Sequence, residues 1–387
     1  MSLDAALSCI SRERAAALTL DLVAIPSPTG DTVEVSERLA AELRALGMEV
    51  ELFLRLPMTP VVIGRMRGAR PGPTLILNGH LDTVPIPHAE PERRDGRVYG
   101  RGTIDMKGPI AAAVEALRAV RDSGLELAGD VLLCAHGLHE APGGHAEDLI
   151  AALEEGAITG DAAIVLEVGH DALPVAGLGS GIYRAHFRRP DDVTHELMTP
   201  SGTPHPAYAA AEAVLALREY QEQLAHTPLE WVGNESVFVG QLHSGDFFNR
   251  FSNHAWIEGT RRYGPDSTAE EAAAGLDSLL RPIADRYGLL FELDFEKVRD
   301  GFRVPLDHPL VSALQQAYQT ETGQPLEPTG IRIVADAPVF QKVGGIPCLY
   351  HGLAGHGAHG DVEWVADAEL ERAARVYLRT LATYLSL

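Results

Sequence analysis

Short apolar runs alternate with amphipathic helical segments along most of this chain, and this alternation constrains the fold more than any other feature. Each run is bounded by Gly, Pro or charged residues, as is typical of strands buried on both faces. The expected strands are residues 61–65, 74–77, 131–135, 163–166 and 347–350. The expected helices are residues 32–46, 109–121, 146–155 and 308–322. This order predicts an α/β domain with a mostly parallel, doubly wound sheet.

The pattern changes near residues 177–181, a glycine-rich segment. The next 120 residues or so predict strands at 182–188, 253–260 and 291–295, and helices at 207–224 and 268–287. The α/β pattern resumes near Arg299, and 387 residues are enough for two domains. We therefore predict a first domain in two parts, 1–177 and 299–387, interrupted by an α+β domain at 178–298.

Charge and cysteine content exclude several classes of protein. The formal net charge of −22 disfavours nucleic acid, because that affinity depends on Lys and Arg neutralising phosphates. The three cysteines lack Cys-x-x-Cys spacing and predict free thiols in a reducing compartment. Neither a secretory leader nor an apolar run of about 18 residues is evident. We expect a cytoplasmic protein that acts on a small molecule and binds neither nucleic acid nor a membrane.

Between residues 75 and 108, metal-binding residue types stand beside glycine-rich turns. His80 and Asp82 follow an apolar run, and residues two apart in an extended segment face the same way. Asp105 follows Gly100 and Gly102 just before an expected helix. Taken singly, His80 and Asp82 fit a surface pair before a turn, and Asp105 fits a helix cap.

Further candidates follow the later strands. His139 and Glu140 come after the run at 131–135, Glu167 ends the next run, and histidines at 351, 356 and 359 follow the last. The carboxyl ends of parallel strands share one edge of a sheet, where ligands bind. Two histidines and three carboxylates, one of them shared, suit two tetrahedral zinc-type centres. The sequence shows neither a nucleophile elbow nor a phosphate loop.

The segments from His80 to Pro85 and from Gly100 to Gly108 read His-x-Asp-x-Val-Pro and Gly-Arg-Gly-x-x-Asp-Met-Lys-Gly. With these motifs the chain resembles the family of acetylornithine deacetylase, succinyl-diaminopimelate desuccinylase, glutamate carboxypeptidase and aminoacylases. The resemblance extends over nearly the whole chain. It implies a catalytic domain interrupted by a lid domain that mediates homodimer formation. It also implies two divalent metal ions, zinc first, with cobalt and manganese as alternatives.

The resemblance further implies a role for each residue of the site. The implied ligands are His80 and Glu167 for one ion, Glu140 and His359 for the other, and Asp105 as the bridge. Asp82 matches the acid that steadies the imidazole of a ligand histidine.

In the lid, His195 matches a histidine that contacts the oxygen of the scissile carbonyl group, and Asn249 and Arg261 match residues that contact the substrate. The spacing from Asn249 to Arg261 is about one residue short of the family pattern, so Arg250 and Arg262 are alternatives for a bidentate contact with a carboxylate.

One position departs from the family pattern. Family members carry two successive acids after this strand, and the first is a glutamate that acts as general base, whereas this chain has His139 followed by Glu140. We predict that His139 replaces that base, since neutral imidazole accepts a proton near neutral pH. The exchange makes the site more positive by about one unit.

The expected function is that of a dinuclear metallohydrolase. It would cleave an amide bond in an N-acyl amino acid or a small peptide-like molecule with a free carboxylate. Two alternatives stay open at this point. One is a metal-dependent aminohydrolase or deaminase that acts on a small aromatic or heterocyclic compound, and the other is a catalytically silent homologue that binds metal.

Overall fold

The computed structural model describes residues 2–140, 143–333 and 335–386. The chain divides into two compact units. The first unit runs up to Val175 and takes in Val304–Thr329 and the chain from Ala335 onward. The second unit is Ala176–Arg303 with a short segment that begins at Gly330, and the sequence analysis did not anticipate that segment. None of the helices in the described residues is long and apolar enough to cross a membrane.

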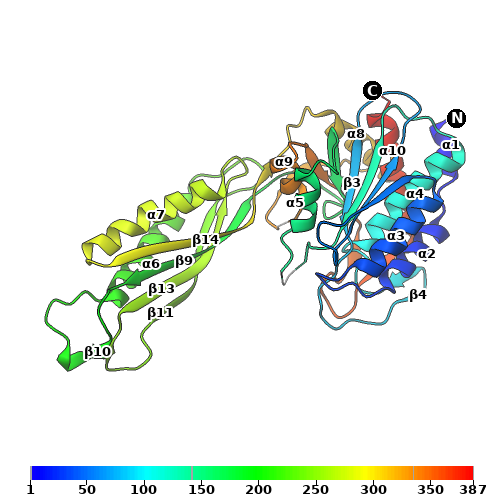
Figure 1. The fold of residues 1–387 in the computed structure, drawn as a ribbon. Coiled ribbons are helices and arrows are strands. Elements are labelled where there is room, and N and C mark those ends of the chain that lie inside the picture. The colour runs from blue at the N-terminus through cyan, green and yellow to red at the C-terminus, as the bar shows by residue number, and fades with distance from the viewer. Residues whose placement is uncertain (1, 141–142, 334, 387) are drawn as a thin grey trace. The chain divides into compact units, whose positions relative to one another are not determined.

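A six-stranded sheet forms the centre of the first unit (Figure 1), in the order β1-β2-β6-β3-β7-β17. The strands are β1 (Glu49–Phe53), β2 (Val61–Met66), β3 (Leu75–His80), β6 (Val131–His136), β7 (Ala162–Val165) and β17 (Cys348–Tyr350). The four strands from β6 to β17 run parallel, whereas β1 and β2 pair antiparallel. Every residue of β3 and β6 is buried, as expected for strands covered on both faces. The predicted mostly parallel sheet is confirmed.

Helices lie on both sides of this sheet (Figure 1). One side carries α2 (Arg12–Val23), α3 (Val33–Ala45) and α4 (Lys107–Ser123), and the other carries α5 (Glu147–Glu154) and α9 (Ala337–Lys342). The C-terminal helix α10 (Asp367–Tyr384) packs against α4 and against α8 (Pro309–Thr322). Helix α4 is followed by Gly124, whose φ of 66° is the left-handed conformation that glycine adopts most readily after a helix.

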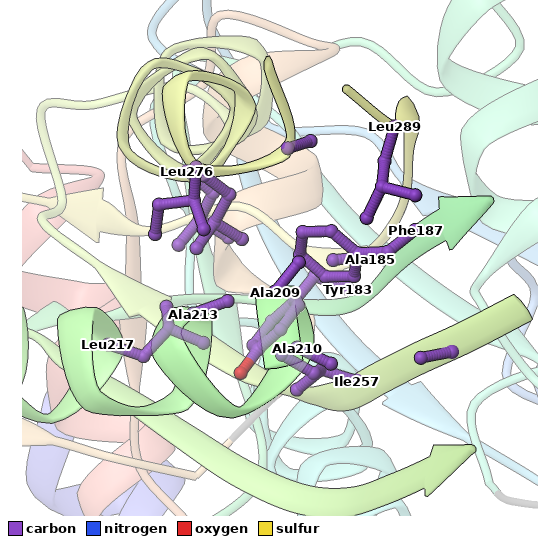
Figure 2. Close-up of a cluster of buried hydrophobic side chains, with 14 of the residues drawn as sticks. Tyr183, Ala185, Phe187, Ala209, Ala210, Ala213, Leu217, Ile257, Leu276 and Leu289 are labelled. Carbon is purple, nitrogen blue, oxygen red and sulfur yellow. The ribbon is translucent and has the colours of Figure 1, made fainter. Parts of the chain in front are cut away.

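The second unit is an antiparallel sheet with two helices on one face. Its strands are β9 (Gly179–Arg188), β11 (Ser236–Ser244), β13 (His254–Tyr263) and β14 (Leu290–Arg299), in the order β11-β13-β9-β14. The helices are α6 (Pro206–Leu224) and α7 (Ala269–Arg286). Figure 2 shows the core between them, where Tyr183 and Phe187 from β9 lie among side chains such as Leu217 and Leu276. A capping box formed by Thr268 and Glu271 starts α7.

A small second sheet in the first unit joins two segments that are far apart in the sequence. In it, β5 (Arg97–Tyr99) pairs with β4 (Glu92–Arg94) and with β19 (Trp364–Ala366), and β19 pairs with β18 (Gly355–His356). The chain just before Asp105 therefore lies beside the chain just after His359. The remaining elements are α1 (Leu3–Ser8), β8 (Leu173–Gly177), β10 (Thr194–His195), η1 (Glu196–Met198), β12 (Arg250–Phe251), β15 (Phe302–Arg303) and β16 (Pro328–Ile331).

Candidate metal centre and active site

Neighbouring parallel strands deliver the candidate residues to one edge of the central sheet. Strand β3 ends at His80, which lies opposite His136 at the end of β6. On the other side of β3, β7 ends two residues before Glu167. Because these strands run in the same direction, the residues that follow them emerge at a common edge.

His80 is fully buried between two acids. Its Nε2 lies 3.0 Å from Oδ1 of Asp105, and its Nδ1 lies 2.9 Å from the main-chain oxygen of Asp82 and 3.5 Å from Oδ1 of that residue. Burial lowers the pKa of His80, but the contacts with Asp105 and Asp82 outweigh burial and raise the pKa well above its usual value. When Nδ1 donates its hydrogen to Asp82, Nε2 is the nitrogen available to a metal ion.

The Asp82 carboxylate also holds the chain that follows β6. Its oxygens accept the main-chain N–H of His139 at 3.1 and 3.2 Å and that of Glu140 at 2.8 Å. Burial favours the neutral acid, yet the hydrogen bond and the charge of His80 hold the pKa of Asp82 well below its usual range. One ionised side chain thus fixes both His80 and the two residues that follow β6.

Asp105 lies between two histidines. Its Oδ1 faces His80, whereas its Oδ2 lies 3.2 Å from Nε2 of His359. The same His359 nitrogen lies 2.8 Å from Oε1 of Glu140. The contacts with Asp105 and Glu140 raise the pKa of His359 to about 10. A carboxylate whose two oxygens face different ligand sets has the geometry of a bridging ligand.

Glu363, which the sequence analysis did not single out, supports the Asp105 loop. Its Oε1 accepts the N–H of Ile104 at 2.9 Å and that of Asp105 at 3.3 Å, and its Oε2 accepts the N–H of Gly102 at 3.1 Å. Arg101 pairs with the same carboxylate at 3.1 Å. Gly102 has a φ of 92°, which favours glycine. Only the tertiary fold reveals this contact, because Glu363 arrives through the small sheet.

Glu167 presents a carboxylate oxygen that needs a partner. Its Oε2 is buried and has no hydrogen-bond partner among the described residues. Burial raises the pKa of Glu167 to about 7, against the opposing charges of His139 and His80. A buried oxygen without a donor is costly, and a bound cation would satisfy it.

His139 lies flat against His80 and reaches a buried acid that the sequence analysis missed. The two rings stack 4.1 Å apart, with an angle of 2° between their planes. Nδ1 of His139 lies 2.7 Å from Oδ2 of Asp336, and Nε2 of His136 lies 3.1 Å from the same oxygen. Burial lowers the pKa of His139, but the Asp336 charge outweighs it and raises the pKa to about 9.

The donor atoms fit divalent cations. Within the described residues, three groups have donor atoms that all lie within 4.8 Å of one another: His80, His139 and Glu167; His80, Asp105 and Glu140; and His136, His139 and Asp336. Imidazole nitrogens and carboxylate oxygens suit zinc, manganese and cobalt. The implied ligands His80, Asp105, Glu140, Glu167 and His359 are thus brought together, whereas His136 and Asp336 form a separate contact behind His139.

The lid candidates belong to the second unit. His195 is exposed, and its Nδ1 lies 3.2 Å from the main-chain N–H of Leu197. The Asn249 side-chain amide lies 3.0 Å from Nε2 of the same ring. His195 and Asn249, predicted from loose matches 54 residues apart, are therefore direct neighbours.

The three candidate arginines have different surroundings. Arg261 is buried and pairs with Glu235 at 2.5 Å and with the Tyr220 hydroxyl at 3.2 Å. Its guanidinium group is therefore already bound by residues of the second unit. Arg250 is exposed and pairs with Asp246. Arg262 is half-buried, and its Nη1 has no hydrogen-bond partner among the described residues.

Residues 76–383 match the sequence profile of peptidase family M20/M25/M40. The chain belongs to this family. A succinyl-diaminopimelate desuccinylase of Bordetella petrii is 28% identical over 95% of this chain and 97% of its own length. The enzyme of the same name from Gluconacetobacter diazotrophicus is 30% identical over 93% of this chain and 95% of its own length. Family membership makes this protein a hydrolase of amide or peptide bonds.

Solved structures share its fold. Aminopeptidase PepT from Bacillus cereus superimposes with a TM-score of 0.79 at 20% identity, covering 98% of this chain and 100% of that one. The YXEP protein of Bacillus subtilis, described as a dinuclear metal-binding peptidase, gives a TM-score of 0.73 at 17% identity, covering 97% and 98%. The predicted fold class, an α/β catalytic domain with an inserted lid, is confirmed.

Proposed function

We propose that this chain hydrolyses the amide bond of an N-acyl amino acid or small peptide with a free carboxylate, using two bound divalent cations. The observation that carries this proposal is the position of Asp105, with one oxygen toward His80 and the other toward His359. The two proposed ligand sets are His80, Asp105 and Glu167, and His359, Asp105 and Glu140. We favour zinc, with cobalt and manganese as alternatives.

The cations, when bound, polarise the amide carbonyl group and make water more acidic. We assign the proton acceptor to Nε2 of His139, because Nδ1 faces Asp336. Asp336 raises the pKa of His139 to about 9, and the charge of two bound cations would lower it, so that the neutral ring is available. Nε2 takes a proton from the attacking water and delivers it to the departing nitrogen. His195 is the proposed hydrogen-bond donor to the carbonyl oxygen.

The curated relatives and the lid support the substrate class. Two relatives that extend over nearly the whole chain are named as desuccinylases of an amino acid, and a succinyl-amino acid carries free carboxylates. Solved neighbours include a tripeptidase from Staphylococcus aureus. Arg262 offers a half-buried guanidinium whose Nη1 lacks a partner in the described residues, which suits a carboxylate. We therefore place the substrate carboxylate at Arg262 rather than at Arg261.

The test is a substrate screen on protein that is stripped of metal and reloaded with zinc, cobalt or manganese. We expect turnover of N-succinyl or N-acetyl amino acids or of dipeptides in the loaded protein, and none in the stripped protein. Ammonia release from aromatic amines alone would replace the proposal with an aminohydrolase. A fully loaded protein that turns over none of these compounds would favour a silent homologue.

His139→Glu, measured beside the wild type, shows whether position 139 selects the substrate. This variant restores the acid found in the family pattern. If it gains activity on N-acetyl amino acids that the wild type handles poorly, the histidine determines specificity. If both proteins share one substrate profile, the histidine contributes only proton transfer.

A further inference from the structure

We propose that Asp336 is a positioning residue that works through His139, holding the imidazole in the tautomer that carries its proton on Nδ1 and leaves Nε2 free to accept one. This inference rests on the proposed function, in which His139 is the base. The carrying observation is the 2.7 Å contact between Nδ1 of His139 and Oδ2 of Asp336, both deep in the first unit.

The Asp336 side chain is directed to the histidines rather than to its own helix. Asp336 occupies the N-cap position of α9, where a carboxylate commonly accepts an N–H of the first turn. Here the side chain makes no capping hydrogen bond with the described residues of α9. It is 0% exposed, and its charge is met by the hydrogen bond with His139 and by the nearby ring of His136.

His136 lies near the same oxygen of Asp336 that His139 contacts. Its Nδ1 lies 3.4 Å from the amide nitrogen of Asn78, a hydrogen donor. An acceptor at Nδ1 places the proton of neutral His136 on Nε2, the atom 3.1 Å from Oδ2 of Asp336. Oδ2 of Asp336 therefore lies close to a ring nitrogen of each histidine, and the positive charge of a protonated ring favours the ionised carboxylate.

Stacking and hydrogen bonding together leave His139 one orientation. The parallel contact with His80 at 4.1 Å fixes the plane of the ring, and the contact with Asp336 fixes its rotation within that plane. A free imidazole populates both tautomers, and only the one with Nδ1–H can accept a proton at Nε2. Asp336 selects that tautomer because an ionised carboxylate can only accept a hydrogen bond.

One proton passes through Nε2 of His139 during the proposed reaction. One water proton moves to Nε2 of His139 as the water oxygen attacks the carbonyl carbon, and the imidazolium formed keeps its Nδ1–H toward Asp336. The same proton then leaves Nε2 for the amide nitrogen as the carbon–nitrogen bond breaks. Asp336 stays ionised throughout and stabilises the transient positive charge.

The test compares Asp336→Asn with Asp148→Asn in zinc-loaded protein. An asparagine keeps the shape of Asp336, but its NH2 group can donate to Nδ1 of His139 and hold the wrong tautomer. Asp148 is a matched control, since it is also buried near the end of β6 and accepts the Gly137 N–H at 2.7 Å. Zinc content and melting temperature are measured for each protein.

The first readout is the tautomer of His139, from the nitrogen chemical shifts of protein labelled with 15N-histidine. We expect the Nδ1–H form in the wild type and in Asp148→Asn, and loss of that form in Asp336→Asn. A wild type that carries the His139 proton on Nε2 overturns the inference. So does a tautomer that Asp336→Asn leaves unchanged.

The second readout is turnover of the amide identified in the substrate screen. We expect kcat to fall about 10- to 100-fold in Asp336→Asn with KM and zinc content unchanged. In a His139→Ala background, the same substitution should have no further effect. A further loss there shows that Asp336 does not act through His139, while the amidase itself stands. A wild type that hydrolyses no amide overturns the proposed function and this role with it, even where the tautomer is as expected.

Discussion

At the scale of single residues, a histidine at position 139 needs more from its surroundings than a glutamate would. A carboxylate accepts a proton at either oxygen, whereas an imidazole accepts one only at the nitrogen that carries none. Asp336, 2.7 Å from Nδ1, is placed to decide which nitrogen that is. It also brings a negative charge beside the ring, and the sequence-based expectation of a site more positive by about one unit omits this charge.

The lid arginines give a prediction at the same scale. Arg262→Ala should raise KM about 10- to 100-fold for a substrate with a free carboxylate, because a charge-assisted contact is lost. Arg261→Ala should instead lower the free energy of unfolding by about 2 kcal/mol, because it removes the buried guanidinium that pairs with Glu235 and Tyr220. Initial rates and urea unfolding distinguish the two. A larger KM effect in Arg261→Ala would reverse our placement of the substrate carboxylate.

At the scale of elements, the Asp105 loop depends on Glu363 for its shape. In the wild type, main-chain N–H groups of this loop donate to the Glu363 carboxylate. Glu363→Gln would place a donor NH2 group against them. We expect zinc affinity to fall about tenfold or more, as for other groups that orient a ligand. Isothermal titration with zinc measures the change.

Glu369→Gln serves as the control for this loop. Glu369 also accepts a main-chain N–H, that of Ala354 at 2.7 Å, and its other hydrogen bonds among the described residues come from Arg372. The zinc affinity of Glu369→Gln should match that of the wild type. Equal losses in both variants would contradict a specific role for Glu363.

The junction between α8 and α10 predicts a dependence on pH. Burial raises the pKa of Glu321, but hydrogen bonds from Arg375 and Arg379 outweigh it and lower the pKa below its ordinary 4.5. A carboxyl whose pKa is lower in the folded state adds stability above pH 4.5 and loses that contribution as the pH falls through the folded value. Glu321→Gln should cost about 1 kcal/mol at neutral pH and progressively less toward about pH 4. A cost that does not change between these pH values in urea unfolding would contradict this origin.

The strands show which secondary-structure elements can be predicted from sequence patterns alone. Strands β3, β6, β7 and β17 were predicted because buried parallel strands leave continuous apolar runs. Strand β1 escaped prediction because it lies at the edge of its sheet and is half-exposed, with charged residues. Strand β11 is likewise an exposed edge strand.

Some residues of the candidate site can likewise be predicted from the sequence, and others cannot. The ligand candidates stand beside glycine turns after strands, and such local patterns can be read from one sequence. Asp336 and Glu363 are single acids without a motif, separated from His139 and Asp105 by 197 and 258 residues. Their roles depend on tertiary packing. A sequence without its fold gives no sign of which buried acid meets which loop.

At the scale of the whole molecule, the expectation of a homodimer through the lid remains a prediction. Edge strand β11 exposes Phe238 and Leu242 at 64% and 52% of their surfaces, a combination typical of interfaces. Light scattering should give twice the 41.6 kDa mass of one chain. Leu242→Lys should weaken the dimer, whereas Leu290→Lys, at the opposite edge of the sheet, should not. A monomeric wild type would contradict the prediction.

In the proposed mechanism, this chain binds two divalent cations and His139 moves the proton. The most direct measurement combines metal content and kcat for the wild type and His139→Ala, both loaded with zinc. We predict two zinc ions per chain in both proteins, with kcat lower in His139→Ala by a factor of about 10² to 10⁴. A variant that keeps full activity would contradict the role of His139 as base. A variant that loses a zinc ion would show instead that His139 is a ligand.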